Sequence, residues 1–136
     1  MINKEIIRIA SNTENHGALD NITHFSKLKN SICGDDMKIY LTVENNKITN
    51  FKYECESCIY CQASVSILSR KAKNKLIEKV KNFAQQANSY FDKSVNSFGK
   101  EWKEFDKIMA INNISRKECL LLPINTMLDA LSKKTL

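Results

Sequence analysis

Thiols and a carboxylate from three distant segments are the side chains of this sequence best suited to chemistry. Cys33 and Asp35 flank Gly34, while Cys58 and Cys119 lie much further along the chain. Three thiolates and one carboxylate suit a tetrahedral Zn²⁺ ion, and they suit iron with bridging sulfide equally well. The hard carboxylate is the ligand most easily displaced from such a set. We predict that Cys33, Asp35, Cys58 and Cys119 form a metal site.

A second cysteine spacing competes with this set. Cys55, Cys58 and Cys61 recur every three residues, as in three quarters of a ferredoxin cysteine run, but the fourth cysteine of that run is missing. If Cys58 opens a helix, Cys61 lies one turn along it and Cys55 stays on the preceding strand. We expect Cys55 to be a small buried residue, and Cys61 to pack beneath the site or to act as an auxiliary thiol. An electron carrier would need both as ligands.

Composition limits the class of protein. The chain has 136 residues, of which 43% are hydrophobic and 26% charged, with three Gly and one Pro, which is typical of one helix-rich globular domain. Five cysteines without a secretion signal favour metal or thiol chemistry in a reducing compartment. No apolar run approaches the roughly 20 residues of a membrane span. We expect a soluble cytoplasmic protein with a single domain over residues 1–136.

The positive charge is concentrated in one stretch. The net charge is +6, and residues 70–81 contain six basic side chains and a single acidic one, Glu78. Aromatic side chains, on which single-stranded nucleic acid stacks, do not interleave the run. We therefore expect the solvated side of a helix. A structural zinc module that binds nucleic acid through this run remains the more remote alternative.

Alternating hydrophobicity predicts a small antiparallel sheet. Residues 36–43 alternate cleanly, residues 47–55 return after Asn45-Asn46, and residues 24–29 form a weaker edge strand. The side chains expected to face the core are Met37, Ile39, Leu41, Val43, Thr49, Phe51, Tyr53 and Cys55. A beginning strand and the end of its hairpin partner are neighbours, which would bring Asp35 close to Cys58.

Helical periodicity covers most of the remaining chain. It predicts helices over residues 4–10, from Cys58 onward, over residues 74–91, after Gly99 and at the C-terminal end. Ser115 and Glu118 have the spacing of a capping box, which would place Cys119 in the first helical turn, and Pro123 kinks or restarts that helix. The predicted fold is α+β, with about three antiparallel strands and several helices on one face.

Three segments, in order, resemble the IscU/NifU/SufU type of iron–sulfur cluster assembly scaffold. Residues 30–35, Asn-Ser-Ile-Cys-Gly-Asp, resemble the family's Asn-Pro-x-Cys-Gly-Asp, with serine in place of proline. Residues 57–66 resemble its Gly-Cys-x-x-x-x-Ala-Ser-x-Ser helix start, with Ser57 in place of glycine. Residues 115–123 resemble its Arg-x-x-Cys-x-x-Leu-Pro-Trp ending, with Ile124 in place of tryptophan.

The resemblance implies an IscU/SufU-like fold and the ligand set Cys33, Asp35, Cys58 and Cys119, which hold zinc or a transient Fe–S cluster. It also implies a cysteine desulfurase as sulfur donor, Fe–S proteins as downstream acceptors, and Cys58 or Cys119 as the residue that accepts sulfur. Glu118 stands where IscU proteins have histidine, and an extra helical segment precedes Cys119. The glutamate departs from IscU, and the extra segment is similar to SufU, a subtype known for tightly held zinc and for accepting persulfide sulfur.

Overall fold

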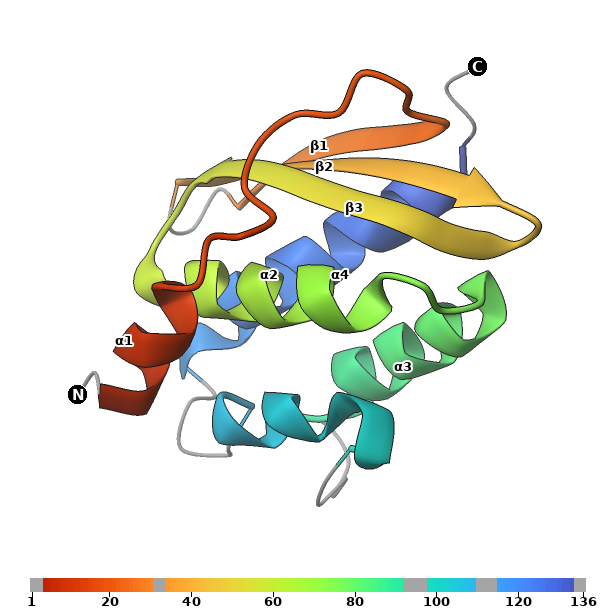
Figure 1. Cartoon of the computed structure of the whole chain (residues 1–136). Helices are drawn as coiled ribbons and strands as arrows, with labels where there is room; N and C mark the ends of the chain where they lie inside the picture. Colours follow the sequence, from red (N-terminus) through yellow and green to blue (C-terminus); the bar gives the residue numbers. More distant parts are fainter. Residues whose placement is uncertain (1–3, 31–33, 92–97, 110–114, 134–136) are drawn as a thin grey trace.

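A three-stranded antiparallel sheet with helices on one face forms the molecule (Figure 1). The computed structural model describes residues 4–30, 34–91, 98–109 and 115–133. Strands β1 (His24–Asn30), β2 (Asp35–Glu44) and β3 (Lys47–Glu56) follow one another in the sheet in chain order. The α+β class, the three strands and the one-sided covering by helices were predicted correctly. Among the described residues, no helix is both long and apolar enough to cross a membrane.

The β2–β3 hairpin follows from its sequence, with one correction. Asn45 and Asn46 adopt positive φ angles of 52° and 62°, which asparagine tolerates better than most residues and which a tight hairpin turn requires. A β-bulge between Thr42 and Val43 then shifts the register. Thr49, predicted to face the core, is therefore only half-buried, and Ile48 is fully buried instead. Beyond the bulge, the predicted alternation is correct.

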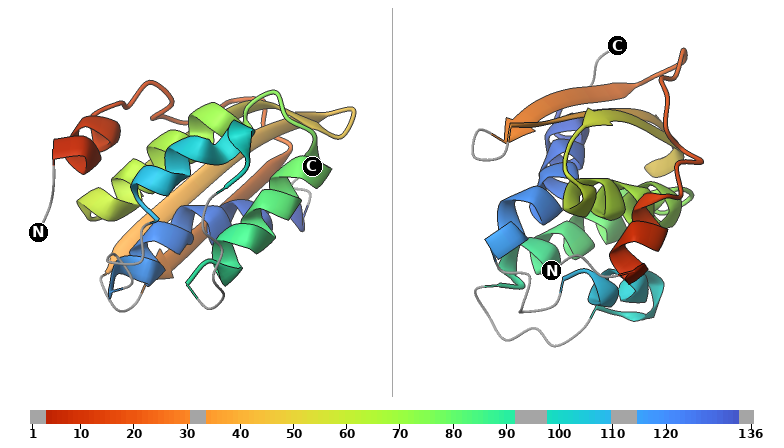
Figure 2. Two further views of the ribbon diagram at one scale, coloured as in Figure 1. Left: turned by 90° about the horizontal axis from the view of Figure 1, so that it is seen from below. Right: turned by 90° about the vertical axis from the view of Figure 1, so that its left-hand side faces the viewer.

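Within the described part of the chain, five helices lie beneath the sheet (Figure 2). α2 (Ile59–Ala72) packs under β3, and α4 (Lys117–Leu131) packs under β1 and β2 and beside α2. α1 (Lys4–Ala10) and the 3₁₀ helix η1 (Lys100–Lys107) contact α2, while α3 (Ile77–Ser89) contacts α4. Since α2 and α4 both carry many fully buried side chains, they form the centre of the core.

Several helix details differ from the predictions. Leu76, inside the helix predicted over residues 74–91, is 43% exposed and precedes α3, which begins at Ile77. Arg116, not Ser115, is the N-cap of α4, and it makes no side-chain capping bond. Pro123 does not restart the helix, because α4 continues through it.

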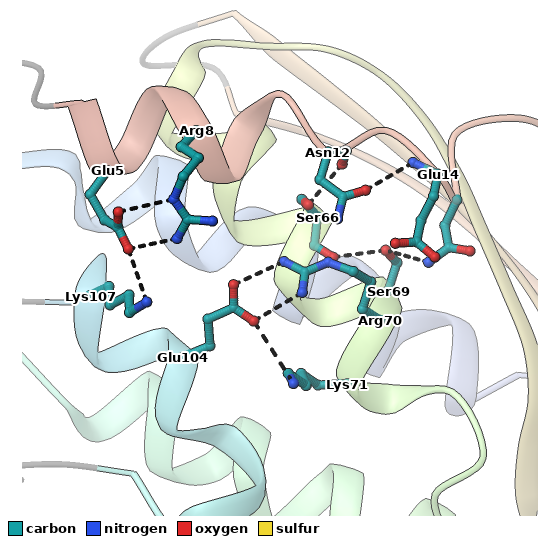
Figure 3. A network of polar contacts seen from close by, with 11 residues as sticks. Glu5, Arg8, Asn12, Glu14, Ser66, Ser69, Arg70, Lys71, Glu104 and Lys107 are labelled. Carbon is teal, nitrogen blue, oxygen red and sulfur yellow. Dashed lines mark hydrogen bonds and ion pairs between the residues drawn. The ribbon is translucent and has the colours of Figure 1, made fainter.

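A polar network joins α1, α2 and η1 at the side of the molecule (Figure 3). The guanidinium of Arg70 donates to both carboxylate oxygens of Glu104, at 2.9 and 3.1 Å. Burial raises the pKa of Glu104, but the hydrogen bonds and charge of Arg70 lower it more, so the net shift is downward. Glu5 in turn pairs with Arg8 and Lys107. These contacts hold η1 against α1 and α2.

Candidate metal centre

Asp35 lies at the start of β2, beside the end of β1. Gly34 precedes it with a φ of +73°, a left-handed conformation that costs glycine little, and its N–H donates to the carbonyl of Asn30 at 2.7 Å. Asp35 pairs with Asn30 across the sheet as the first residue of β2, on the same face as Met37 and Ile39. Its side chain is therefore directed to the helices, and the residue is only 3% exposed.

Cys58 is the N-cap residue of α2 and is separated from the end of β3 by Ser57 alone. Its backbone φ and ψ, −71° and 167°, are those of an extended chain entering a helix. Its N–H donates to Asp35 Oδ1 at 3.0 Å. This hydrogen bond ties the start of β2 to the start of α2.

Cys119 reaches the same place from the opposite part of the core. It is the third residue of α4 and is 1% exposed. Asn30 Nδ2 lies 3.9 Å from its Sγ, within the range of an N–H···S hydrogen bond. The Ser64 hydroxyl of α2 donates to the carbonyl of Leu120 at 2.7 Å and so fixes the two helices against each other beside the cysteine.

The three side chains converge. One carboxylate oxygen of Asp35 and the sulfur atoms of Cys58 and Cys119 all lie within 4.8 Å of one another. In a tetrahedral zinc site the ligand atoms are about 3.3–3.8 Å apart, because the metal–ligand bonds measure about 2.0–2.3 Å. Small side-chain movements would therefore suffice for the three to bind one ion.

A buried, unsatisfied oxygen supports this fit. Asp35 Oδ2 has no hydrogen-bond partner among the described residues, although it is shielded from water. Such an atom costs about 1–3 kcal/mol unless something else binds it. With Oδ1 engaged by Cys58, Oδ2 is the atom that a metal ion would complete.

Three further cysteines remain, and only one of them, Cys33, was predicted as a ligand. Cys33 lies outside the described residues. Cys55, expected to be buried, is only half-buried near the end of β3, whereas Cys61 is fully buried in the first turn of α2. Burial raises the pKa of both thiols above the usual cysteine value, with the Ser57 hydroxyl and the charge of Asp35 as smaller influences. Neither belongs to the converging group of three.

The basic run of residues 70–81 is only partly a solvated helix side. Arg70 and Lys71 turn toward Glu104, at 2.9 and 3.9 Å, and Lys79 pairs with Glu101 at 3.6 Å. This ion pairing removes part of the free positive charge that a nucleic-acid surface would need.

Two functional contacts of the site were not predicted. Asn30 beside Cys119, and Ser64 against the Leu120 carbonyl, join residues 89 and 56 positions apart. Asn30 stands in the segment that carries Cys33 and Asp35, which was the available signal. A serine within a helix can face solvent or the core, and its hydroxyl can bond to several kinds of group. Sequence spacing alone therefore could not identify the Leu120 carbonyl as the partner of Ser64.

Comparison with known proteins agrees with this architecture. The family model of the NifU-like N-terminal domain matches residues 1–112, which include Asp35 and Cys58 but end before Cys119. The iron–sulfur cluster assembly scaffold protein IscU of Thermotoga maritima is 27% identical over 134 residues, covering 98% of this chain and 94% of its own. An uncharacterised protein of Borreliella burgdorferi is 29% identical over 96% of this chain and 82% of its own.

Solved structures share the fold. The N-terminal NifU-like protein of Brucella abortus superposes with a TM-score of 0.89 at 19% identity, covering 96% of this chain and 91% of its own. FiSufU from Fervidobacterium islandicum, assigned as a cluster assembly scaffold of the SUF system, gives 0.84 at 23% identity, covering 96% of both chains. The three-stranded sheet, the helices beneath it and the match over residues 1–112 together show that this chain belongs to the family of the NifU-like N-terminal domain.

Proposed function

We propose that this chain acts in iron–sulfur cluster assembly, where it holds a metal ion or a nascent cluster and accepts sulfur from a cysteine desulfurase. The proposed ligands are Cys33, Asp35, Cys58 and Cys119. The observation that carries the proposal is the convergence of Asp35, Cys58 and Cys119, whose ligand atoms lie within 4.8 Å of one another. Membership of a family whose relatives include the Thermotoga maritima scaffold IscU supports it.

Each proposed ligand has a distinct role. The thiolates of Cys58 and Cys119 supply soft, anionic sulfur ligands from two helix starts. The Cys58 N–H holds one oxygen of Asp35, so the other oxygen can leave and return without the carboxylate turning away. A bound Zn²⁺ or iron would keep these thiols deprotonated near neutral pH. Asp35, the hardest ligand, then provides the position where exchange begins.

Sulfur acceptance follows from the exposure of the two cysteines. Cys58 is half-buried, whereas Cys119 is almost fully buried, so a persulfide carried by a partner protein can reach Cys58 more easily. The Cys58 thiolate attacks the outer sulfur of the donor's persulfide. A new sulfur–sulfur bond forms at Cys58, and the donor cysteine leaves as a thiolate. The sulfur then passes to cluster formation and to downstream Fe–S acceptor proteins.

A zinc-dependent sulfur acceptor is the second candidate, and the compactness of the site favours it. Three ligand atoms within 4.8 Å suit one ion, whereas a cluster divides its ligands between two or more iron atoms. In this version, zinc activates the thiol and no cluster is built on the chain.

The test is the metal and acid-labile sulfide content of protein purified without oxygen, together with Cys33→Ser, Cys58→Ser and Cys119→Ser variants. Iron with sulfide would identify a cluster scaffold, and one zinc without sulfide a sulfur acceptor. Incubation with a cysteine desulfurase and sulfur-labelled cysteine should then label wild type and not Cys58→Ser. Metal that survives all three substitutions would contradict the proposed ligands.

A further inference from the structure

The start of α2 carries a thiol pair, Cys58 and Cys61, of which only Cys58 belongs to the proposed metal site. Cys58 is the N-cap, and its carbonyl accepts the N–H of Gln62 at 3.0 Å, so the first helical turn spans the two cysteines. Cα atoms three residues apart in a helical turn lie about 5 Å from each other. Disulfides form at Cα separations of about 4.4–6.8 Å. The backbone therefore allows a Cys58–Cys61 disulfide.

The two cysteines differ sharply in access. Cys58 is half-buried at the surface end of the turn, while Cys61 is 0% exposed and packs in the core. In a Cys-x-x-Cys pair at a helix start, the outer cysteine exchanges with external sulfur compounds. A persulfide on another protein cannot reach Cys61, so Cys61 can react only with sulfur already attached to its neighbour.

We propose that Cys61 releases sulfide from a persulfide on Cys58, an inference that rests on the proposed sulfur acceptance by Cys58. The Cys61 sulfur attacks Sγ of Cys58 and forms the Cys58–Cys61 disulfide. The bond between Cys58 Sγ and the outer sulfur breaks, and its electron pair leaves with the outer sulfur. That sulfur takes the proton of the Cys61 thiol and departs as hydrogen sulfide, which supplies the reduced sulfur that cluster formation needs.

A dithiol must then reset the pair. The outer sulfur gains two electrons when it leaves as sulfide, and the two cysteine thiols lose them when the disulfide forms. An external dithiol reductant then returns Cys58 and Cys61 to thiols by thiol–disulfide exchange. While the disulfide persists, Cys58 cannot bind metal. Sulfide release and metal binding at Cys58 are therefore alternating states of one residue.

The test loads the full-length protein with glutathione persulfide without oxygen, removes the excess donor and follows two readouts. Released sulfide is measured over time, and the mass of the peptide containing Cys58 and Cys61 is measured by mass spectrometry after alkylation. Wild type should gain one sulfur atom, then release sulfide as the peptide becomes two hydrogens lighter than its reduced form. In Cys61→Ala, the persulfide should persist on Cys58 and sulfide release should slow at least about tenfold, because the intramolecular thiol is lost.

Cys55→Ser is the matched control, since Cys55 precedes Cys58 by the same three residues but lies on β3. It should load and release as wild type does. Cys61→Ser, which also lacks the thiol but differs in polarity, should behave like Cys61→Ala. Mild oxidation of wild type by diamide should give the same disulfide without any persulfide.

Three results would overturn the inference. One is equal retention of a loaded persulfide in wild type and Cys61→Ala, which leaves sulfur acceptance intact but removes internal release. The second is a block in Cys55→Ser with normal release in Cys61→Ala, which assigns the pair to Cys55 and Cys58. The third is the absence of persulfide on Cys58 in every variant, which overturns sulfur acceptance as well.

Discussion

Replacing Asp35 by asparagine should stabilise the metal-free protein and weaken its metal binding. Asp35 is 3% exposed, with Oδ1 bonded to the Cys58 N–H and Oδ2 unpartnered among the described residues. Asparagine keeps the Oδ1 acceptor and removes the buried negative charge. A buried, unpaired charge costs more than a buried neutral amide, although the unsatisfied N–H groups of that amide still cost about 1–3 kcal/mol. We expect the free energy of unfolding of the metal-free Asp35→Asn variant to rise by about 1–2 kcal/mol.

Zinc should reverse this order. Outer-shell partners of a metal site already contribute about 10–100-fold in affinity, so the loss of an anionic ligand should weaken binding at least about 100-fold. At a zinc concentration about 1,000 times the wild-type Kd, a 100-fold weaker variant loses about 2.7 kcal/mol of metal-dependent stabilisation. Urea unfolding in chelator and in excess zinc measures both effects on the same protein.

Asp36→Asn provides the control. Asp36 is the adjacent residue on the opposite face of β2, where its Oδ1 lies 4.0 Å from Lys29 Nζ. The substitution removes the same charge at the neighbouring position, outside the site, so the stabilisation by zinc should not change. If Asp35→Asn is destabilised without metal, or is stabilised by zinc as much as wild type, Asp35 is not a buried, unsatisfied carboxylate that binds the metal.

Three further substitutions test the surroundings of the site. Arg70→Met should lower the free energy of unfolding by about 1–3 kcal/mol at neutral pH. Because the pKa of Glu104 is lowered in the folded state, this contribution is present above about pH 4.5 and disappears as the pH falls through the depressed pKa. The stabilities of wild type and variant, measured by urea unfolding, should therefore converge in acid. Ser64→Ala should cost about 1 kcal/mol in urea unfolding through the lost bond to the Leu120 carbonyl, and an unchanged midpoint would deny that contact. Cys55→Ser should retain the wild-type metal content, whereas loss of metal would favour a ferredoxin-like ligand set.

Short-range patterns predicted much of this fold. The alternation of Met37, Ile39 and Leu41 determined one face of β2, and Asn45-Asn46 determined the turn, because both depend on neighbouring residues alone. The error at Thr49 arose from the bulge at Thr42, which depends on how β2 and β3 pair and leaves no mark in the spacing of either strand.

Long-range pairing explains what was missed near the site. The capping box predicted at Ser115 gave way to an α4 that begins at Lys117, because tertiary packing decides where a helix starts as much as its capping residues do. The bonds of Arg70 to Glu104 join residues 34 positions apart, and each partner alone resembles an ordinary surface charge. Asp35 and Cys58 were brought together correctly because hairpin topology alone makes their strand ends neighbours.

X-ray absorption at the edge of the bound metal, on protein purified without oxygen, identifies the atoms that bind the metal at the proposed site. We expect three sulfur ligands at about 2.3 Å and one oxygen ligand at about 2.0 Å if the metal is zinc. Asp35→Asn should weaken or shift the short oxygen contribution, and Cys58→Ser should remove one sulfur. A shell of four sulfur atoms, or one without sulfur, would contradict a site built from Asp35, Cys58 and Cys119.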